Sequence, residues 1–432
     1  MTAPIPGEPG PGPLADLRVV ELQSEAGAFA GKLLADMGAD VVTVEPPGGA
    51  ATRALPPFLD DEPHPERSLH FWHYNLNKRA VTLDWTRPRG HDLLLCLLDG
   101  ADALLEAEGP GALAGHGLGD DVVRSDRPGL IHVSMTPFGR DGPRAHEQAT
   151  DLTLLAGGGP AWSCGYDDHT LPPVAGGGYQ GYQTACHFAV MGLLTALLHR
   201  DAGGPGQRVD VNMHAANNVT TEAASVSWHV ARATVGRQTG RHAAVQPTQP
   251  TIAQCADGRW VNTGMPPRSG AQFRAVHDWL RELDLLDGFA EAALIEEGMQ
   301  QGQLSFAEIR ENDLLRAMFH AGRDALSRIA AALDAYDFFT GGQERGFQCG
   351  VINAPEEIMA DPHIVARGFP VEVEHPEVGR RIRYPGAPYR FGATPWTVRR
   401  RASLIGEDNE AVFGSLGLSA GEIASLRRSG VI

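Results

Sequence analysis

The sequence lacks the features that mark a secreted, membrane-spanning or metal-binding protein. No run of about 18 apolar residues occurs, so no membrane span is expected. The first 13 residues have neither the basic start nor the apolar stretch of a secretory signal, and their Pro and Gly content predicts a disordered tail over 1–13. The five cysteines lack CxxC spacing and no HExxH occurs, so we expect no disulfide framework, no metal site and a cytoplasmic protein.

Positive charge is also scarce. The formal net charge of −17 disfavours nucleic acid and anionic membranes as partners. A polyanionic ligand would therefore need a local cluster of basic residues. No GxGxxG follows the first predicted strand, which leaves a nicotinamide cofactor without support.

What the first half does contain is an alternation of short β-branched runs with helical patterns. Strands are predicted at 17–22, 40–45, 80–84, 103–105, 130–135 and 209–212, and helices at 26–37, 91–98, 183–199 and 217–234. This strand–helix–strand order predicts an α/β fold with a doubly wound parallel sheet. The texture changes near Val245, where short strands and acidic helices indicate a second domain.

Several motifs occur in a fixed order along the chain. They are Gly38–Pro46 (GADVVTVEP), Asn75–Arg79 (NLNKR), Gly109–Leu113 (GPGAL), Phe138–Pro143 (FGRDGP), Gly192–Arg200 (GLLTALLHR), Gly204–Val211 (GPGQRVDV) and Pro385–Phe391 (PGAPYRF). Together they resemble the class III CoA-transferases, a family that includes formyl-CoA and carnitine CoA-transferases and the related α-methylacyl-CoA racemases. The resemblance runs from about Leu14 to Ile432.

The resemblance carries expectations about fold and activity. It implies a large Rossmann-like domain formed by both chain ends (14–225 and 385–432), a smaller α+β domain (245–365), and two interlocked subunits in a homodimer. It also implies an acyl-CoA and a small carboxylic acid as substrates. Coenzyme A would then be a substrate or product, and no permanently bound cofactor is expected.

The position of the family's nucleophile is unusual in this chain. In the family an Asp ten residues before the Gly of the GILAAL motif attacks the thioester and forms a mixed anhydride. Counting back from Gly192 gives Tyr182, and neither Asp nor Glu occurs between 176 and 184. A phenol has an ordinary pKa of about 10 and is a poor substitute for a carboxylate. The covalent mechanism is therefore unsupported.

Two further positions depart from the family. An Arg that contacts a CoA phosphate in the family corresponds to Gly115. In the racemase branch, a His precedes the Asp that matches Asp151, and here that His is Thr150. Asp151 itself is interpreted as a helix N-cap rather than a catalytic group.

The candidate site residues follow from these matches. Tyr182, as a hydrogen-bond donor to a thioester carbonyl, and His187, on the following helix, are the catalytic candidates. The candidate substrate-binding residues are Asn77, Lys78, Arg79, Arg140, Gly177, Gly178 and Gly181, with the basic side chains on CoA phosphates and the glycines allowing close backbone approach.

Three functions remain open on the sequence. The chain is a CoA-transferase with an adapted mechanism, a non-catalytic or acyl-CoA-binding subunit of an Asp-bearing paralogue, or an acyl-CoA lyase, isomerase or racemase that uses Tyr182 with a His.

Overall fold

The computed structural model describes residues 12–221 and 224–432, and these divide into two compact units. The first unit runs to Ala161 and includes Ala175–Thr221 and Pro362–Ile432. The second contains Trp162–Val174 and the described residues from 224 to Asp361. The predicted tail lies almost wholly outside the described residues. The change of texture near Val245 did not reveal that Trp162–Val174 belongs with the later segment.

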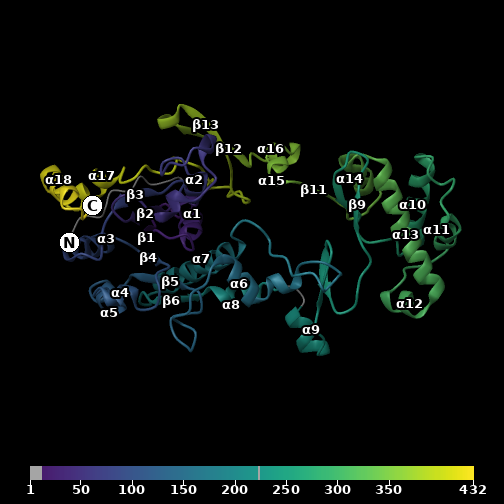
Figure 1. Cartoon of the computed structure of the whole chain (residues 1–432), viewed down its shortest axis with the longest axis horizontal. Coiled ribbons are helices and arrows are strands. Elements are labelled where there is room, and N and C mark those ends of the chain that lie inside the picture. The colour runs from purple at the N-terminus through teal and green to yellow at the C-terminus, as the bar shows by residue number, and fades with distance from the viewer. Residues whose placement is uncertain (1–11, 222–223) are drawn as a thin grey trace. The chain divides into compact units, whose positions relative to one another are not determined.

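The first unit is built on a six-stranded sheet in which every pairing is parallel (Figure 1). Its strand order is β3-β2-β1-β4-β5-β6. The strands are β1 (Arg18–Leu22), β2 (Asp40–Glu45), β3 (Arg79–Thr82), β4 (Ala103–Glu106), β5 (Ile131–Thr136) and β6 (Arg208–Asn212). This is the Rossmann order, in which the direction of winding reverses between β1 and β4. The predicted doubly wound sheet is confirmed.

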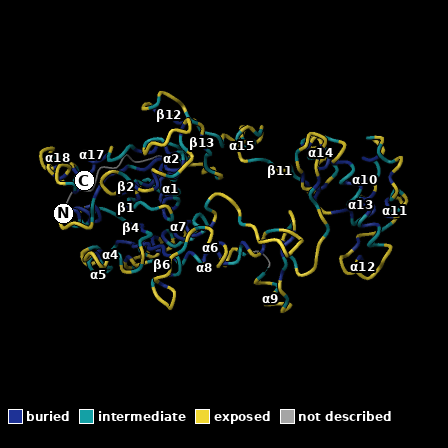
Figure 2. The backbone as a smooth tube through the Cα atoms, viewed as in Figure 1, coloured by how far each residue is buried: buried dark blue, intermediate teal, exposed yellow. Residues whose placement is uncertain are grey.

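Helices cover both faces of this sheet. They are α1 (Ala28–Asp36), α2 (Leu69–Tyr74), α3 (Pro88–Leu98), α4 (Ala112–Gly115), α5 (Asp120–Arg124), α6 (Asp151–Gly158), α7 (Gln180–Asp201) and α8 (Met213–Val219). The short 3₁₀ helices Ala51–Ala54 and Leu59–Asp61 lie between β2 and α2, and a third spans Pro160–Ser163. The strands are mostly buried (Figure 2), as expected of a parallel sheet covered on both sides.

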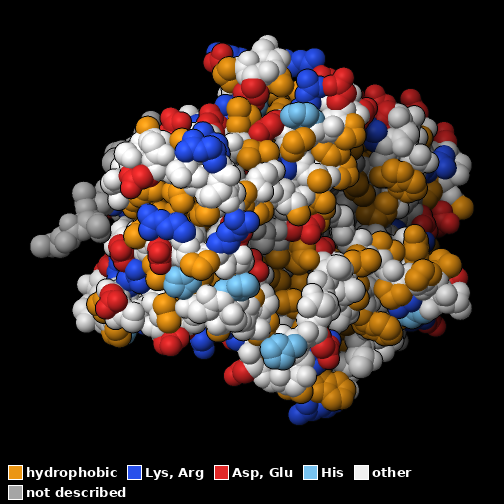
Figure 3. Space-filling view, turned by 60° about the vertical axis from the view of Figure 1, so that its left-hand side comes forward, with side chains coloured by type: hydrophobic (Ala, Val, Ile, Leu, Met, Phe, Trp, Pro, Cys, Tyr) orange, Lys and Arg blue, Asp and Glu red, His pale blue; other side chains and the backbone are white. Residues whose placement is uncertain are grey.

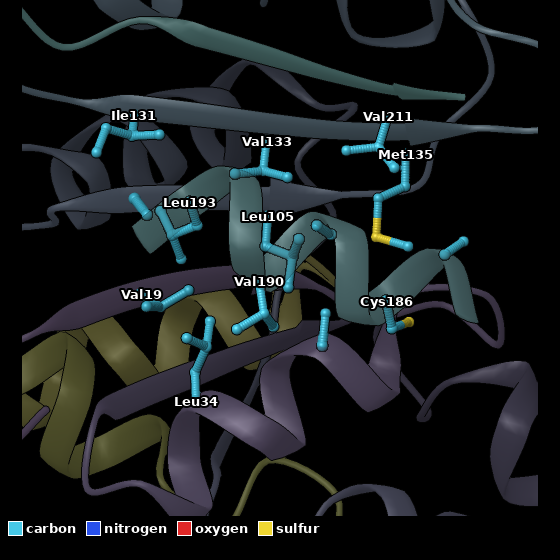
Figure 4. Close-up of a cluster of buried hydrophobic side chains, with 14 of the residues drawn as sticks. Val19, Leu34, Leu105, Ile131, Val133, Met135, Cys186, Val190, Leu193 and Val211 are labelled. Carbon is cyan, nitrogen blue, oxygen red and sulfur yellow. The ribbon is translucent and has the colours of Figure 1, made fainter. Parts of the chain in front are cut away.

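Helix α7 is the central helix of one face. It is long and apolar enough, by length and composition, to cross a membrane. Its side chains instead enter the core of the first unit, where Cys186, Val190 and Leu193 point among strand residues such as Val133 (Figure 4). A helix that is apolar on most sides is expected at such a buried position. The helix is therefore a core element of the fold.

The C-terminal end returns to the first unit, as the resemblance implied. Helices α17 (Asn409–Ser415) and α18 (Ala420–Arg428) place Phe413 and Ile423 in the core on the other face of the sheet. The Asp408 carboxylate accepts a hydrogen bond from Ala80 N at 2.8 Å, and Asn409 Oδ1 accepts one from Thr82 N at 2.9 Å. These hydrogen bonds give partners to backbone N–H groups of β3, an edge strand of the sheet, which would otherwise be unpaired.

The remaining elements are smaller. The second unit has an antiparallel sheet of β9 (Ile252–Gln254), β10 (Trp260–Asn262) and β11 (Gly350–Ile352). It also has a hairpin of β7 (Gly236–Gln238) and β8 (Arg241–Ala244). Its helices are α9 (Ala224–Ala231), α10 (Gly270–Glu282), α11 (Ala292–Gly298), α12 (Phe306–Glu311), α13 (Asp313–Ala332), α14 (Ala335–Glu344) and α15 (Pro355–Ile358). The first unit adds α16 (Pro362–Ala366), β12 (Pro370–His375), a 3₁₀ turn at Pro376–Val378 and β13 (Arg380–Pro385).

One predicted helix is wrong. The pattern at 217–234 predicted one continuous helix, but α8 ends at Val219 and α9 begins at Ala224. The Thr220 hydroxyl donates a hydrogen bond to Asn217 O at 2.8 Å. Threonine side chains that bond to nearby backbone groups compete with helix continuation, which explains the end of α8.

Candidate functional site

The first turn of α7 is held by a carboxylate from the preceding helix. Asp151 Oδ1 accepts a hydrogen bond from Tyr182 N at 2.8 Å. The helix α6 to which Asp151 belongs is capped instead by Thr150, whose hydroxyl accepts from Thr153 N. Asp151 therefore caps its neighbour and not its own helix. This agrees with the interpretation of Asp151 as a helix cap, which left open the helix that it serves.

Gly181 makes this cap possible. A Cβ added at Gly181 would lie 3.0 Å from Asp151 Oδ1 and 3.1 Å from Asp151 O, closer than most side chains tolerate. The carbonyl of Gly181 also accepts a hydrogen bond from Asn217 Nδ2 at 3.2 Å, and Asn217 is fully buried. Gly181 thus joins α6, α7 and α8 at one point. Its place in the structure is that of a packing residue.

Aromatic rings surround the same helix start. Tyr179 lies parallel to Tyr182 with ring centroids 6.3 Å apart, and the Tyr179 ring contacts His70 at 5.1 Å. His70 contacts Tyr74 at 4.7 Å, and the hydroxyl of Tyr74 accepts a hydrogen bond from Gln183 Nε2 at 2.9 Å. Elements far apart in sequence, α2 and α7, therefore share one cluster of rings.

The electrostatics keep the phenols protonated. Burial, with the Glu25 and Asp151 carboxylates, raises the pKa of Tyr182 to about 12. Burial also raises the pKa of Tyr179, and the negative charge of the Glu25 carboxylate adds to this rise. Tyr182 at neutral pH is thus a hydrogen-bond donor and not a phenolate nucleophile.

Lys78 does not occupy a ligand position. Its side chain is fully buried, and Nζ lies 2.7 Å from Glu21 Oε2, 2.8 Å from Ala28 O and 3.1 Å from Asn75 Oδ1. These acceptors engage the whole ammonium group. Burial lowers the pKa of Lys78 and raises that of Glu21. The expectation that Lys78 contacts CoA phosphates is corrected, because its charge is held inside the fold.

Asn77 and Arg79 also serve the fold. Asn77 is buried and donates to Asp36 Oδ1 at 2.7 Å and to Thr397 O at 3.1 Å. Arg79 makes a two-point ion pair with Asp40 at 2.6 and 2.9 Å, joining β3 to the start of β2. Residues of the NLNKR motif therefore connect α1, β2, β3 and the C-terminal segment that contains Thr397. The motif was predicted to bind ligand because it matches the family and its basic side chains suit phosphates, and the partners that hold these side chains lie far away in sequence.

Arg140 joins an internal polar network. Its guanidinium donates to Ser134 Oγ at 2.9 Å and to Glu106 Oε1 at 3.3 Å. The same Glu106 oxygen lies 3.4 Å from His132 Nε2. Gly115 ends the short helix α4 with open space where a Cβ would be. On the face drawn in Figure 3, basic and acidic side chains are interspersed, and they form no single basic patch.

The remaining predicted residues lie at or near the start of α7. Gly177 and Gly178 precede the helix, are exposed and have open space around them, and Gly178 has a φ of +83° that favours glycine. His187 is exposed, its Nδ1 lies 2.8 Å from Gln183 O, and its ring packs on Phe29 at 5.5 Å. The structure thus brings Gly181, Tyr182 and His187 to one helix.

Sequence reasoning missed Glu25, His70, Tyr74 and Tyr179. None of them lies in the motif around Tyr182 except Tyr179, and no spacing rule links α2 to α7. The one available signal was the scarcity of tyrosine: the chain has seven, and three of them meet here. The resulting site can donate hydrogen bonds and stack planar groups, but its tyrosines cannot form an anhydride.

Comparison with known proteins assigns the fold and the family. The sequence matches CoA-transferase family III over residues 14–409. It is 30% identical to succinyl-CoA:(R)-benzylsuccinate CoA-transferase subunit BbsE of Thauera aromatica, covering 96% of this chain and 97% of the relative. It is 31% identical to formyl-CoA:oxalate CoA-transferase of Streptomyces avermitilis, covering 97% and 99%.

A CAIB/BAIF family protein from Brucella suis has the same fold, with a TM-score of 0.75 at 23% identity over 94% of this chain and 99% of that one. The family match covers residues of both structural units. The chain belongs to CoA-transferase family III.

Proposed function

We propose that this chain handles acyl-CoA thioesters as part of a CoA-transferase, which moves CoA between an acyl-CoA and a small carboxylic acid. The observation that carries this proposal is the family match over 14–409, together with relatives that are themselves CoA-transferases. Coenzyme A is then a substrate and product, and the protein needs no permanently bound cofactor.

We propose further that α7 of this chain does not supply the nucleophile. Its first turn, Gln180 to Gln183, carries no carboxylate, and the Tyr182 phenol stays protonated. The Asp151 carboxylate also uses Tyr182 N, one of the helix N-terminal amides that would otherwise stabilise an oxyanion. Each of these facts weakens the case for a covalent step on this chain alone.

A second family III chain that carries the Asp would complete the enzyme. The Thauera relative supports this, because its name describes a subunit. The homodimer implied by the resemblance is the competing assembly.

The alternative of a lyase, isomerase or racemase needs an acid–base pair at Tyr182. Within residues 12–221 and 224–432, the ring contact of Tyr182 is with Tyr179, and His187 Nδ1 lies 2.8 Å from the backbone oxygen of Gln183, so no acid–base pair of Tyr182 with a His is formed there.

Mass spectrometry of the intact protein after incubation with an acyl-CoA tests this proposal. A mixed anhydride or a glutamyl or aspartyl CoA thioester adds a defined mass, and hydroxylamine removes it. We expect no adduct on this chain alone. The adduct should form on an Asp of an added family III chain, within a complex of measured heteromeric mass. An acyl or CoA adduct on any Asp or Glu of this chain would contradict the proposal.

A further inference from the structure

The rings at the start of α7 form a continuous cluster. His187 contacts Phe29 at 5.5 Å, Phe29 contacts Tyr74 at 6.0 Å, and Tyr74 contacts His70 at 4.7 Å. The cluster continues through Tyr179 to Tyr182, whose ring planes differ by 10°. We call these six rings the aromatic cluster. They come from α1, α2, α7 and Tyr179, the residue before α7, all within the first unit.

The titratable side chains that face the aromatic cluster are uncharged or negatively charged. Burial lowers the pKa of His70 and lowers that of neighbouring His73 to about 4, so both imidazoles are uncharged at neutral pH. Lys32 lies near His73 but is buried in an ion pair with Asp36. The negative charges of Glu25 and Asp151 help to raise the pKa of both Tyr179 and Tyr182, so both carboxylates act on this end of the cluster. A ligand group with its own carboxylate would be repelled here.

Tyr179 occupies a backbone conformation that tyrosine rarely adopts. As the residue before α7 it has a φ of +58° and a ψ of +34°, in the left-handed region. This conformation costs roughly 1–2 kcal/mol for a residue with a side chain, and the three residues before it are glycines that could adopt it freely. Because glycine would make this turn at a lower cost, a tyrosine here indicates that the ring itself has a role.

We propose that the aromatic cluster binds an uncharged aryl group in the acyl part of a CoA thioester. The substrate class is aryl-substituted acyl-CoA, and the inference rests on the proposed acyl-CoA function. Parallel and edge-on rings favour an aryl group because the negative ring faces attract the positive edges of another ring. A saturated ring of the same size offers no such edges. Tyr179 and Tyr182 are half-buried and His187 is exposed, so these three rings of the cluster are open to a ligand, and the two tyrosines supply the phenol rings.

The test is calorimetric titration of the full-length protein with a matched pair of esters, phenylacetyl-CoA and cyclohexylacetyl-CoA. The two differ only in the aromaticity of the ring, and the saturated ring is the more hydrophobic. We expect phenylacetyl-CoA to bind about 2- to 10-fold more tightly. Tyr182→Leu and Tyr179→Leu should each reduce this ratio toward one, whereas Tyr182→Phe should keep it because the ring remains. Circular dichroism checks that each variant is folded.

The outcomes separate this inference from the proposed function. Equal binding of the two esters, or tighter binding of cyclohexylacetyl-CoA, overturns the aryl preference and leaves acyl-CoA handling intact. Failure to bind either ester, or CoA itself, at millimolar concentration overturns both. A ratio that survives both leucine variants overturns the location of the aryl site.

Discussion

Asp151 Oδ1 and Tyr182 N are joined by a hydrogen bond of 2.8 Å, so the start of α7 depends on a side chain of α6. The two residues are 31 positions apart. The bond fixes where the first turn of α7 begins and therefore where the Tyr182 ring lies. It also brings a negative charge to the helix N-terminus, where negative charge is stabilising. The candidate site is thus organised by a structural carboxylate.

Replacing Asp151 tests this cap. We expect Asp151→Ala to weaken the first turn of α7 by about 1 kcal/mol, the usual cost of a lost N-cap. Asp151→Asn keeps an acceptor oxygen and should recover most of the loss. Hydrogen–deuterium exchange is the measurement: the Tyr182 amide should exchange about fivefold faster in the alanine variant. Equal exchange in all three proteins would show that the bond contributes nothing.

The buried pair of Lys78 and Glu21 makes a second prediction. Lys78→Met leaves the Glu21 carboxylate buried without its partner, which costs about 3–5 kcal/mol. The double variant Lys78→Met with Glu21→Leu replaces both charges with apolar groups and should regain most of this. Urea unfolding of Lys78→Met, of Glu21→Leu and of the double variant measures the coupling free energy between the two side chains.

The double variant also separates a structural Lys78 from a ligand. Because Lys78 is fully buried, we expect the folded double variant to bind CoA as the unaltered protein does. A large loss of CoA affinity in a double variant that retains its stability would restore Lys78 as a phosphate contact.

The sequence predicted local features well and distant pairings poorly. The strand β2 was predicted with its observed bounds, and α7 to within three residues at each end, because both follow from hydrophobic pattern and turn residues. The burial of Lys78 was not predictable, since its partner Glu21 is 57 residues away and lysine is usually exposed. The family motifs located residues that are important in this chain. They did not distinguish residues that contact a ligand from residues that hold the fold together.

His73 makes the stability of the first unit depend on pH. Burial lowers its pKa from 6.5 to about 4, so between these values the unfolded chain binds a proton that the folded chain excludes. The free energy of unfolding should therefore fall as the pH falls from about 6.5 to about 4, by up to about 1.4 kcal/mol per pH unit. His73→Phe removes the titrating group and should reduce this slope.

Unfolding by urea at several pH values gives the slopes. The exposed His146 provides a matched control, because His146→Phe should leave the slope as it is in the unaltered protein. The same slope in the His73 variant and the unaltered protein would mean that the imidazole is not excluded from protonation by its surroundings.

Tyr182→Phe tests whether the phenol donates to a thioester. The pKa of Tyr182, raised to about 12, keeps the hydroxyl proton in place across the physiological range, and the ring is half-buried. Loss of one such donor should weaken binding of any acyl-CoA about 2- to 10-fold, since a neutral hydrogen bond contributes about 0.5–1.5 kcal/mol. The effect should be the same for aryl and saturated esters, because the ring that stacks is unchanged. Tyr179→Phe is the control for a general effect of removing a hydroxyl, because Tyr179 precedes α7 and the hypothesis assigns no donor role to its hydroxyl. Titration of all three proteins with one acyl-CoA decides the matter: unchanged affinity in Tyr182→Phe would leave Tyr182 as a packing ring alone.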